Sequence, residues 1–276
     1  MTVREDTDDG RRPGPVAESR LRTWLSVLRH SMLSQLRQQH ILSAVIPGCV
    51  VPAALCMATL LARQPDSVLT TEQIQLGCGV LALWSCSIWQ TGLILREELW
   101  HGTLPGILTR RAGLGSVLFG KTIGTASRCA LLIVATIACV GLVTGSPLRI
   151  AHPAVFALTA LMTFASALVL GMLLSCLFLL TPAAMRIAEA LIYPMSLLGG
   201  MIIPIDLLPV WLRYVPNVIS LRWATELLTE AAQGRSQSTV AWVLLFATTG
   251  AYALMAGWSF KTVLYRARKR GDLAIA

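Results

Sequence analysis

The sequence predicts an all-α membrane protein with six transmembrane helices, preceded by an amphipathic helix at the membrane interface. Its 276 residues are 55% hydrophobic and 13% charged, whereas a soluble domain carries about 25% charged residues. Apolar stretches of about 20 residues, the length needed to cross a bilayer, fill most of the chain. Basic residues gather in alternate connections between these stretches, as they do in the cytoplasmic loops of membrane proteins.

The segments outside the spans are polar or amphipathic. Residues 1–17 are rich in charge, proline and glycine and lack the apolar core of a signal peptide, so we expect a disordered cytoplasmic tail. In residues 18–40 apolar side chains recur every three or four positions, which predicts an amphipathic interface helix. We expect the spans within residues 41–261 and a basic cytoplasmic tail at 262–276.

The first three spans are expected at residues 41–62, 74–95 and 122–143. Each would be about 33 Å long at 1.5 Å per residue, which is enough to cross the hydrocarbon core of a bilayer. The second span carries polar side chains, among them Gln75, Ser87 and Thr91. We therefore expect one of its faces to lie against protein or water and not against lipid.

The last three spans are expected at residues 154–180, 188–203 and 240–260. The fifth is short and is interrupted by glycines and a proline, and short broken spans often line transport pathways. We therefore take Glu189, Gly199, Gly200 and Pro204 as candidate pathway residues. For Glu189, an equally good alternative is an ion pair with Arg186, three positions earlier.

Two apolar segments between the fifth and sixth spans are too short to cross. The first is residues 207–215, and the second is a helix that Ser220 can cap at its N-terminus. The apolar face of that helix comprises Leu221, Ala224, Leu227, Leu228 and Ala231. Both segments are expected to rest at the membrane interface.

The distribution of basic residues predicts the orientation. Of the 23 Lys and Arg residues, 17 fall in segments on the side of the two termini. This bias places both termini in the cytoplasm, in a multi-pass protein of the cell membrane. It also accounts for the net charge of +9, so we expect no nucleic-acid partner.

One motif resembles a nucleotide site. Residues 115–122 match the phosphate-loop pattern, but such a loop needs a buried strand before it and a soluble helix after it. Here the following residues form a span, so Lys121 is better interpreted as an interfacial anchor. The seven cysteines lie in apolar stretches and lack metal-site spacing. We expect no enzyme activity, no metal site and no cofactor bound by this chain.

The connection after the second span contains a short apolar stretch at the cytoplasmic face. It follows Glu98, at the end of the second span, and includes Gly102, Thr103, Leu104 and Leu108. Such a stretch must be buried against something. A soluble partner is one possibility, and the loops of the bundle itself are the other.

These residues carry a resemblance to a known family. Glu98, Gly102, Thr103, Leu104 and Leu108 are similar to the E-x-x-x-G-T-L-x-x-x-L segment of type-2 ATP-binding-cassette (ABC) exporter permeases. A second match follows near the fifth span, with the pattern G-x-x-x-P, then L-P-x-W-L, then P, at Gly200, Pro204, Leu208, Pro209, Trp211, Leu212 and Pro216. The resemblance covers essentially the whole chain after residue 17.

The resemblance implies the membrane half of an ABC exporter. The second motif would lie on a re-entrant helical pair before the last span. Two permease chains, as a homodimer or with a sister chain, would form the path, and separate ATPase subunits would hold ATP and magnesium. The residues from Glu98 to Leu108 would then couple the permease to the ATPase. Pro105 and Trp100 depart from the family, which often has acidic residues there.

The nature of the cargo is left open by the sequence. Few charges lie inside the spans, which favours an amphiphilic compound. Within the family, export of a drug or antibiotic, as in multidrug efflux, is the first expectation, and export of a lipid or polysaccharide is the alternative. A self-sufficient secondary transporter is an alternative of another class, but it would need ion-coupling carboxylates, and only Glu189 comes close.

Overall fold

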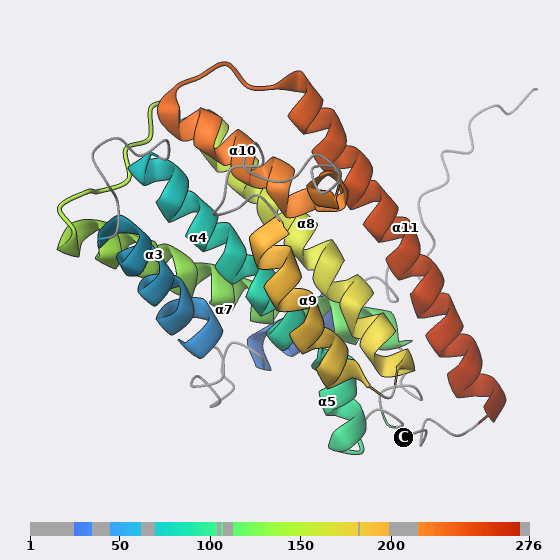
Figure 1. The fold of residues 1–276 in the computed structure, drawn as a ribbon. Coiled ribbons are helices and arrows are strands. Elements are labelled where there is room, and N and C mark those ends of the chain that lie inside the picture. Colours follow the sequence, from blue (N-terminus) through green and yellow to red (C-terminus); the bar gives the residue numbers. More distant parts are fainter. Residues whose placement is uncertain are drawn as a thin grey trace, which may run out of the picture.

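The computed structural model describes residues 25–34, 45–61, 70–103, 106, 113–181, 183–198 and 215–270. All the regular elements in these residues are helices, which confirms the all-α class (Figure 1). Four helices are long and apolar enough to cross a bilayer, namely Thr71–Trp100, Leu114–Val143, Pro153–Leu180 and Thr239–Tyr265. They coincide with the second, third, fourth and sixth predicted spans.

The first and fifth predicted spans are described only in part. The first contains a π-helix η1 (Ile46–Val50) followed by α3 (Val51–Leu61). The fifth contains α9 (Ala184–Leu198), whose 15 residues are shorter than a span. Residues 41–44 and 199–214 lie outside the described part of the chain. The count of six spans and the re-entrant pair therefore remain predictions.

The second span is the central helix of the bundle. It begins as α4 (Thr71–Cys86) at a capping box in which Thr70 and Gln73 bond each other's backbone N–H groups. It continues through the π-helix η2 (Ser87–Thr91) into α5 (Ile94–Trp100). Its polar residues Gln75, Ser87 and Thr91 are buried. The prediction that a polar face lies against protein is thus confirmed.

The helices around this centre are held by close contacts. α7 (Gly113–Val143) packs against α4, and α8 (Pro153–Leu180) packs against η2 and α11 (Thr239–Arg270). At the α8–η2 contact, a Cβ added to Gly171 would lie 2.8 Å from Cβ of Thr91. Helices in membranes associate through this kind of small-residue contact.

The amphipathic helix predicted after residue 220 is inside the bundle. A short 3₁₀ turn, η5 (Val215–Val218), leads into α10 (Ser220–Gln233). The five residues of its predicted apolar face are at most 5% exposed, because α10 packs against α4, α8 and α11. The prediction that Ser220 caps the helix is wrong. Ile219 is the N-cap, and the Ser220 hydroxyl accepts a hydrogen bond from Ser166 at 2.8 Å.

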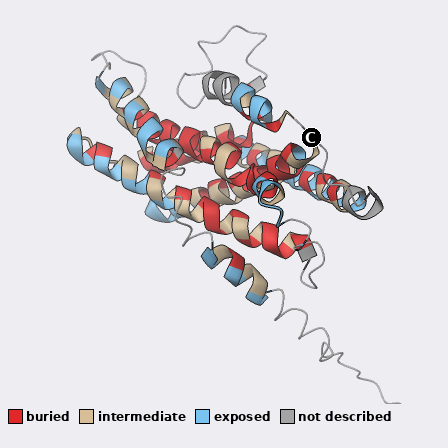
Figure 2. Ribbon diagram, turned by 90° about the horizontal axis from the view of Figure 1, so that it is seen from below, coloured by how far each residue is buried: buried red, intermediate tan, exposed pale blue. Residues whose placement is uncertain are grey.

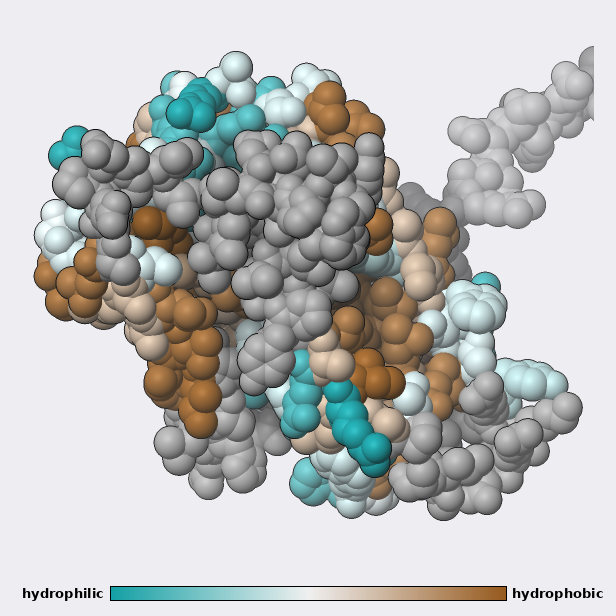
Figure 3. Space-filling model, in the orientation of Figure 1, coloured by the Kyte–Doolittle hydropathy of each residue, from teal (hydrophilic) through white to brown (hydrophobic). Residues whose placement is uncertain are grey.

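Polar and apolar side chains are distributed over the surface as expected for a protein in a bilayer. Buried residues face the interior of the bundle, and exposed residues lie on the outward sides of the helices (Figure 2). Polar side chains gather at two opposite ends, with apolar side chains between them (Figure 3). Near the middle of their helices, Leu131 of α7 and Leu254 of α11 are 70% and 79% exposed. Such large exposed apolar residues are expected where lipid is the solvent.

Candidate functional site

The end of α5 explains the spacing of the Glu98, Gly102 and Thr103 motif. Gly102 has a left-handed backbone with φ of +68°. Its N–H donates to the Leu99 carbonyl at 3.0 Å, and the Thr103 N–H donates to the Glu98 carbonyl at 3.0 Å. These two bonds form a Schellman motif, in which glycine is the residue that tolerates the left-handed turn. The sequence E-x-x-x-G-T therefore forms the C-terminal cap of α5.

The Glu98 side chain connects this helix end to α7. Its carboxylate accepts a hydrogen bond from the Thr103 hydroxyl and forms an ion pair with Nζ of Lys121. Both charged side chains are largely covered, with 15% of Glu98 and 17% of Lys121 exposed. A pair with so little solvent around it is stronger than one on the open surface.

The structure rejects the nucleotide interpretation of residues 115–122. All of them lie within α7, so their backbone N–H groups are committed to the helix and cannot cradle a phosphate. The predicted role of Lys121 as an anchor at the interface becomes more specific, because its ammonium group is bound to Glu98.

The N-terminal amphipathic helix, described over residues 25–34, lies on α7 at the same place. A Cβ added to Gly120 would stand 2.6 Å from the Leu28 carbonyl oxygen and 3.0 Å from Cβ of Ser31. Among residues 25–34, Ser31 is the buried one, with 8% of its surface exposed. The glycine therefore sets how closely the two helices approach.

A polar pocket of about 720 Å³ lies between these elements. The N-terminal helix, the end of α5 and the first turns of α7 surround it. Its lining comprises Ser26, Val27, His30, Ser31, Ser34, Glu98, Gly102, Thr103, Gly106, Val117 and Lys121. Among the described residues no group of three His, Cys, Asp or Glu residues could hold a metal ion. The pocket offers hydroxyl groups and one charge pair among apolar atoms, which suits an amphipathic protein surface.

Arg96 ties the end of the second span to the end of the fourth. The residue is buried, and its Nη1 donates to the carbonyls of Phe178 at 3.1 Å and Thr181 at 2.6 Å. These carbonyls end α8 and have no partner within that helix. The guanidinium carbon also lies 5.7 Å from the ring centroid of Trp100. Movement of α5 would thus be passed to the α8–α9 turn.

The structure brings together three of the predicted coupling residues, Glu98, Gly102 and Thr103. The other two, Leu104 and Leu108, lie outside the described residues, as do Gly199, Gly200 and Pro204 of the candidate pathway. Glu189 is exposed on α9, and in the described part of the chain no ion pair joins it to Arg186.

Sequence reasoning missed the roles of Lys121 and Arg96. Lys121 is 23 positions from Glu98, and Arg96 is 82 positions from Phe178. No local periodicity links such residues. The sequence signal available for Arg96 was an arginine at the end of an apolar span, because a charge at membrane depth is usually paired.

Comparison with protein families assigns the chain to a family. The model of the family described as ABC-2 type transporter matches residues 22–232, from the N-terminal helix to the end of α10. A comparison with curated proteins gave no match. Members of this family are transport permeases that typically work with an ATPase subunit. The match confirms the resemblance inferred from the two motifs, and the chain belongs to the ABC-2 type transporter family.

Proposed function

We propose that this chain is the permease subunit of an ABC exporter that moves an amphiphilic compound out of the cytoplasm. ATP would be hydrolysed on a separate ATPase subunit, and a second permease chain would complete the path. Both termini would lie in the cytoplasm. A drug or antibiotic is the first cargo class, and a lipid or polysaccharide is the alternative.

The junction built around Glu98 is the observation that carries this proposal. The end of α5, the start of α7 and the N-terminal helix meet there around one polar pocket. All three lie at the end of the bundle that the basic residues assign to the cytoplasm. An ATPase that docks at this pocket would touch three elements at once. It could then move them as a unit.

The contacts of the junction suggest how force would spread. Lys121 binds Glu98 and so links α5 to α7, and Arg96 links α5 to the end of α8. Closure of the ATPase would favour one arrangement of these helices over another, since a ligand shifts an equilibrium only through unequal affinity for its two states. Coupling would extend to α9, which carries Glu189 and leads to Gly199, Gly200 and Pro204.

The amphiphilic cargo is supported by the composition of the four candidate spans. Their acidic residues, Glu72, Glu97 and Glu98, fall in the first or last turns of Thr71–Trp100. A path through such helices offers little to stabilise a strongly cationic compound. The same distribution disfavours a secondary transporter, which needs a carboxylate at mid-membrane depth.

Co-purification with an ATPase tests the proposal. The full chain would be expressed with the ABC ATPase encoded beside it, extracted in detergent and isolated through a tag on its C-terminus. We expect the ATPase to accompany the wild-type chain. Gly102→Pro removes the N–H that bonds Leu99 and conflicts with a φ of +68°, so we expect it to reduce ATPase recovery severalfold while the chain remains in the membrane.

Glu98→Ala should reduce transport of a fluorescent amphiphile from inverted vesicles and leave the amount of chain in the membrane unchanged. The control is Glu72→Ala, which removes an acidic residue at the opposite end of the same helix. Normal transport by Glu98→Ala and Gly102→Pro would reject the coupling site. Transport driven by an ion gradient with no ATPase present would favour a secondary transporter instead.

A further inference from the structure

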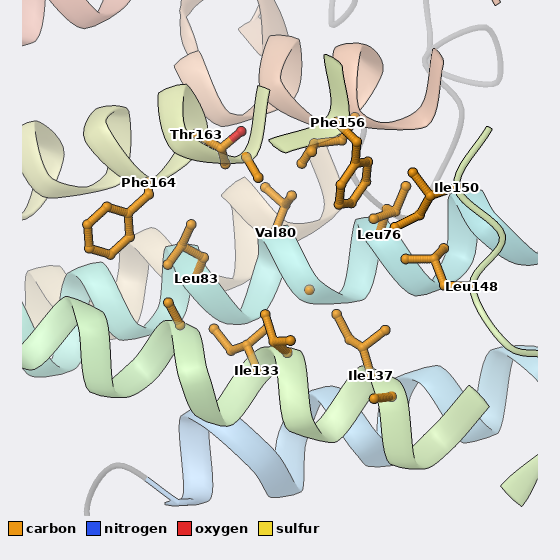
Figure 4. A pocket seen from close by; sticks show the side chains of 16 residues that line it. Leu76, Val80, Leu83, Ile133, Ile137, Leu148, Ile150, Phe156, Thr163 and Phe164 are labelled. Carbon is orange, nitrogen blue, oxygen red and sulfur yellow. The ribbon is translucent and has the colours of Figure 1, made fainter. Parts of the chain in front are cut away.

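A narrow crevice runs between α4, α7 and α8, away from the Glu98 junction (Figure 4). Its volume is about 340 Å³, and 16 residues line it. Val80 and Leu83 of α4 form its floor, while α7 and α8 supply the walls. Leu148 and Ile150, in the connection between α7 and α8, lie at one end.

The lining is hydrocarbon throughout. Thr163 is the one lining residue with a polar side chain, and its hydroxyl donates to the Thr159 carbonyl at 2.8 Å within α8. The crevice therefore offers an occupant no hydrogen-bond donor, and its one possible acceptor is the oxygen of this hydroxyl. Water needs two to four polar partners to be held in a cavity, so neither water nor a lipid headgroup would be stable there.

The crevice opens sideways at hydrocarbon depth. Apart from Leu228 of α10, its helical walls belong to three candidate membrane spans. At its mouth, Val134 of α7 is 66% exposed, whereas Leu76 and Val80 on the floor are 5% and 4% exposed. It lies toward the ends at which Thr71, Val143 and Pro153 meet, the half that the proposed orientation assigns to the outer leaflet.

The shape of the crevice indicates which kind of occupant suits it, a lipid chain or a protein helix. The lining of α4 extends from Leu76 to Leu83, roughly 10 Å of helix axis. This length matches that of about eight methylene groups of an extended hydrocarbon chain, and the slender apolar groove suits such a chain better than a whole helix about 10 Å across.

We propose that this crevice binds one acyl chain of a bilayer phospholipid, whose headgroup stays outside at the membrane surface. An empty crevice would deprive its lining of dispersion contacts. In a bilayer the surrounding lipid is as apolar as the lining, so packing alone favours the bound chain. The lipid should therefore exchange with the bilayer. A bound chain would fill the gap between α7 and α8 and resist their approach.

Photocrosslinking tests this inference. The full chain would be reconstituted into phosphatidylcholine and phosphatidylglycerol vesicles containing a phosphatidylcholine with a diazirine at the middle of one acyl chain. After irradiation, mass spectrometry would locate the label. We expect label on α4 between Leu76 and Leu83, which is buried from the bulk lipid. Label on the exposed Leu254 of α11 serves as the internal reference.

Filling the crevice should remove this label. Ala160→Phe places a ring in the crevice from α8, and we expect label on α4 to fall severalfold relative to Leu254. Ala157→Phe is the matched control, because Ala157 is exposed on the same helix and outside the lining. Ala130→Phe fills the crevice from α7, with the exposed Ala135→Phe as its control, so the test survives if one filled variant does not fold.

Two results would overturn the inference. One is strong label on α11 with none on α4 in the wild-type chain, which would mean that a second copy covers the mouth. The other is equal label on α4 in folded wild-type, Ala160→Phe and Ala130→Phe chains. The readout needs no ATPase and no transport, so it is independent of the proposed function.

Discussion

At the scale of single residues, the Glu98–Lys121 ion pair is the contact of the junction in which each side chain depends most on its partner. Its side chains are 15% and 17% exposed, so each charge depends on the other for much of its stabilisation. Removing one partner of such a pair leaves a poorly solvated charge, and this costs more than the loss of an exposed salt bridge. The hydroxyl of Thr103 adds a further bond to the Glu98 carboxylate.

A charge-reversal cycle measures this pair. We expect Glu98→Lys and Lys121→Glu each to reduce ATP-driven transport severalfold, because each places like charges together between α5 and α7. The double variant restores an opposite pair and should regain a large part of the activity. A coupling energy of roughly 0.5–3 kcal/mol is typical for residues in contact. Additive losses in the double variant would show that the two residues act separately.

At the scale of elements, two glycines determine how helices approach one another. Gly120 lets the N-terminal helix lie against the start of α7, and Gly171 lets α8 lie against η2. Neither site has space for a methyl group. In the first case the obstacle is the Leu28 backbone oxygen, and in the second it is the Oγ1 of Thr91, followed by its Cβ. Atoms close to the backbone cannot move away as the end of a long side chain would.

Gly120→Ala should loosen the N-terminal helix without unfolding the bundle. An added Cβ would lie 2.6 Å from the Leu28 oxygen, so the helix must shift outward. We expect faster proteolysis within residues 25–34 and lower recovery of the ATPase. Gly115→Ala is the control on the same helix, because its Cβ would meet Phe260 at an ordinary 3.5 Å. Equal proteolysis of both variants would contradict the proposed contact.

Gly171→Ala should destabilise the bundle itself. The methyl group would overlap Thr91, and overpacking of this kind typically costs about 1–3 kcal/mol. We expect the midpoint of thermal unfolding in detergent to fall by several degrees. At Gly250 of α11 an added Cβ meets no atom of the described chain within 4 Å. Gly250→Ala should therefore leave the midpoint unchanged or raise it, since alanine favours helix.

At the scale of the whole molecule, two polar ends enclose an apolar middle zone (Figure 3). At one end, Glu98 and Lys121 join the end of α5 to α7, and Arg96 joins α5 to the α8–α9 turn. The N-terminal helix lies against α7 at Gly120. At the other end, α10 is tied to the start of α8 by the Ala151 N–H, which donates to the Ala232 carbonyl at 3.0 Å. A signal at the first end would have to travel along α4, α7 and α8.

Topology reporters test the orientation and the number of spans. Fusions that end after residues 112, 150, 182 and 276 should report cytoplasm, outside, cytoplasm and cytoplasm, because basic residues stay inside. Between the last two points the chain contains α9 and α11. If the segment that begins with α9 does not cross, the fusion after residue 276 will lie outside, and the count of six spans is wrong.

Much of the architecture could be predicted because it depends on local patterns. Apolar length placed the second, third, fourth and sixth spans, and the spacing of Leu221, Ala224 and Leu227 identified the buried face of α10. The extent of α7 was underestimated. Its helix begins at Gly113 and not near residue 122, because its first turns are covered by other parts of the protein and need not be apolar enough to match a span.

The sequence by itself determined the helical class, the membrane environment and the family, since each follows from composition, apolar length and short motifs. Only the tertiary structure decided that Lys121 binds Glu98, that Arg96 caps α8 and that Ser220 bonds Ser166. These partners lie 23 to 85 positions apart. Which side chains meet over such distances depends on which faces of the helices pack together, and a pattern along one helix does not contain that information.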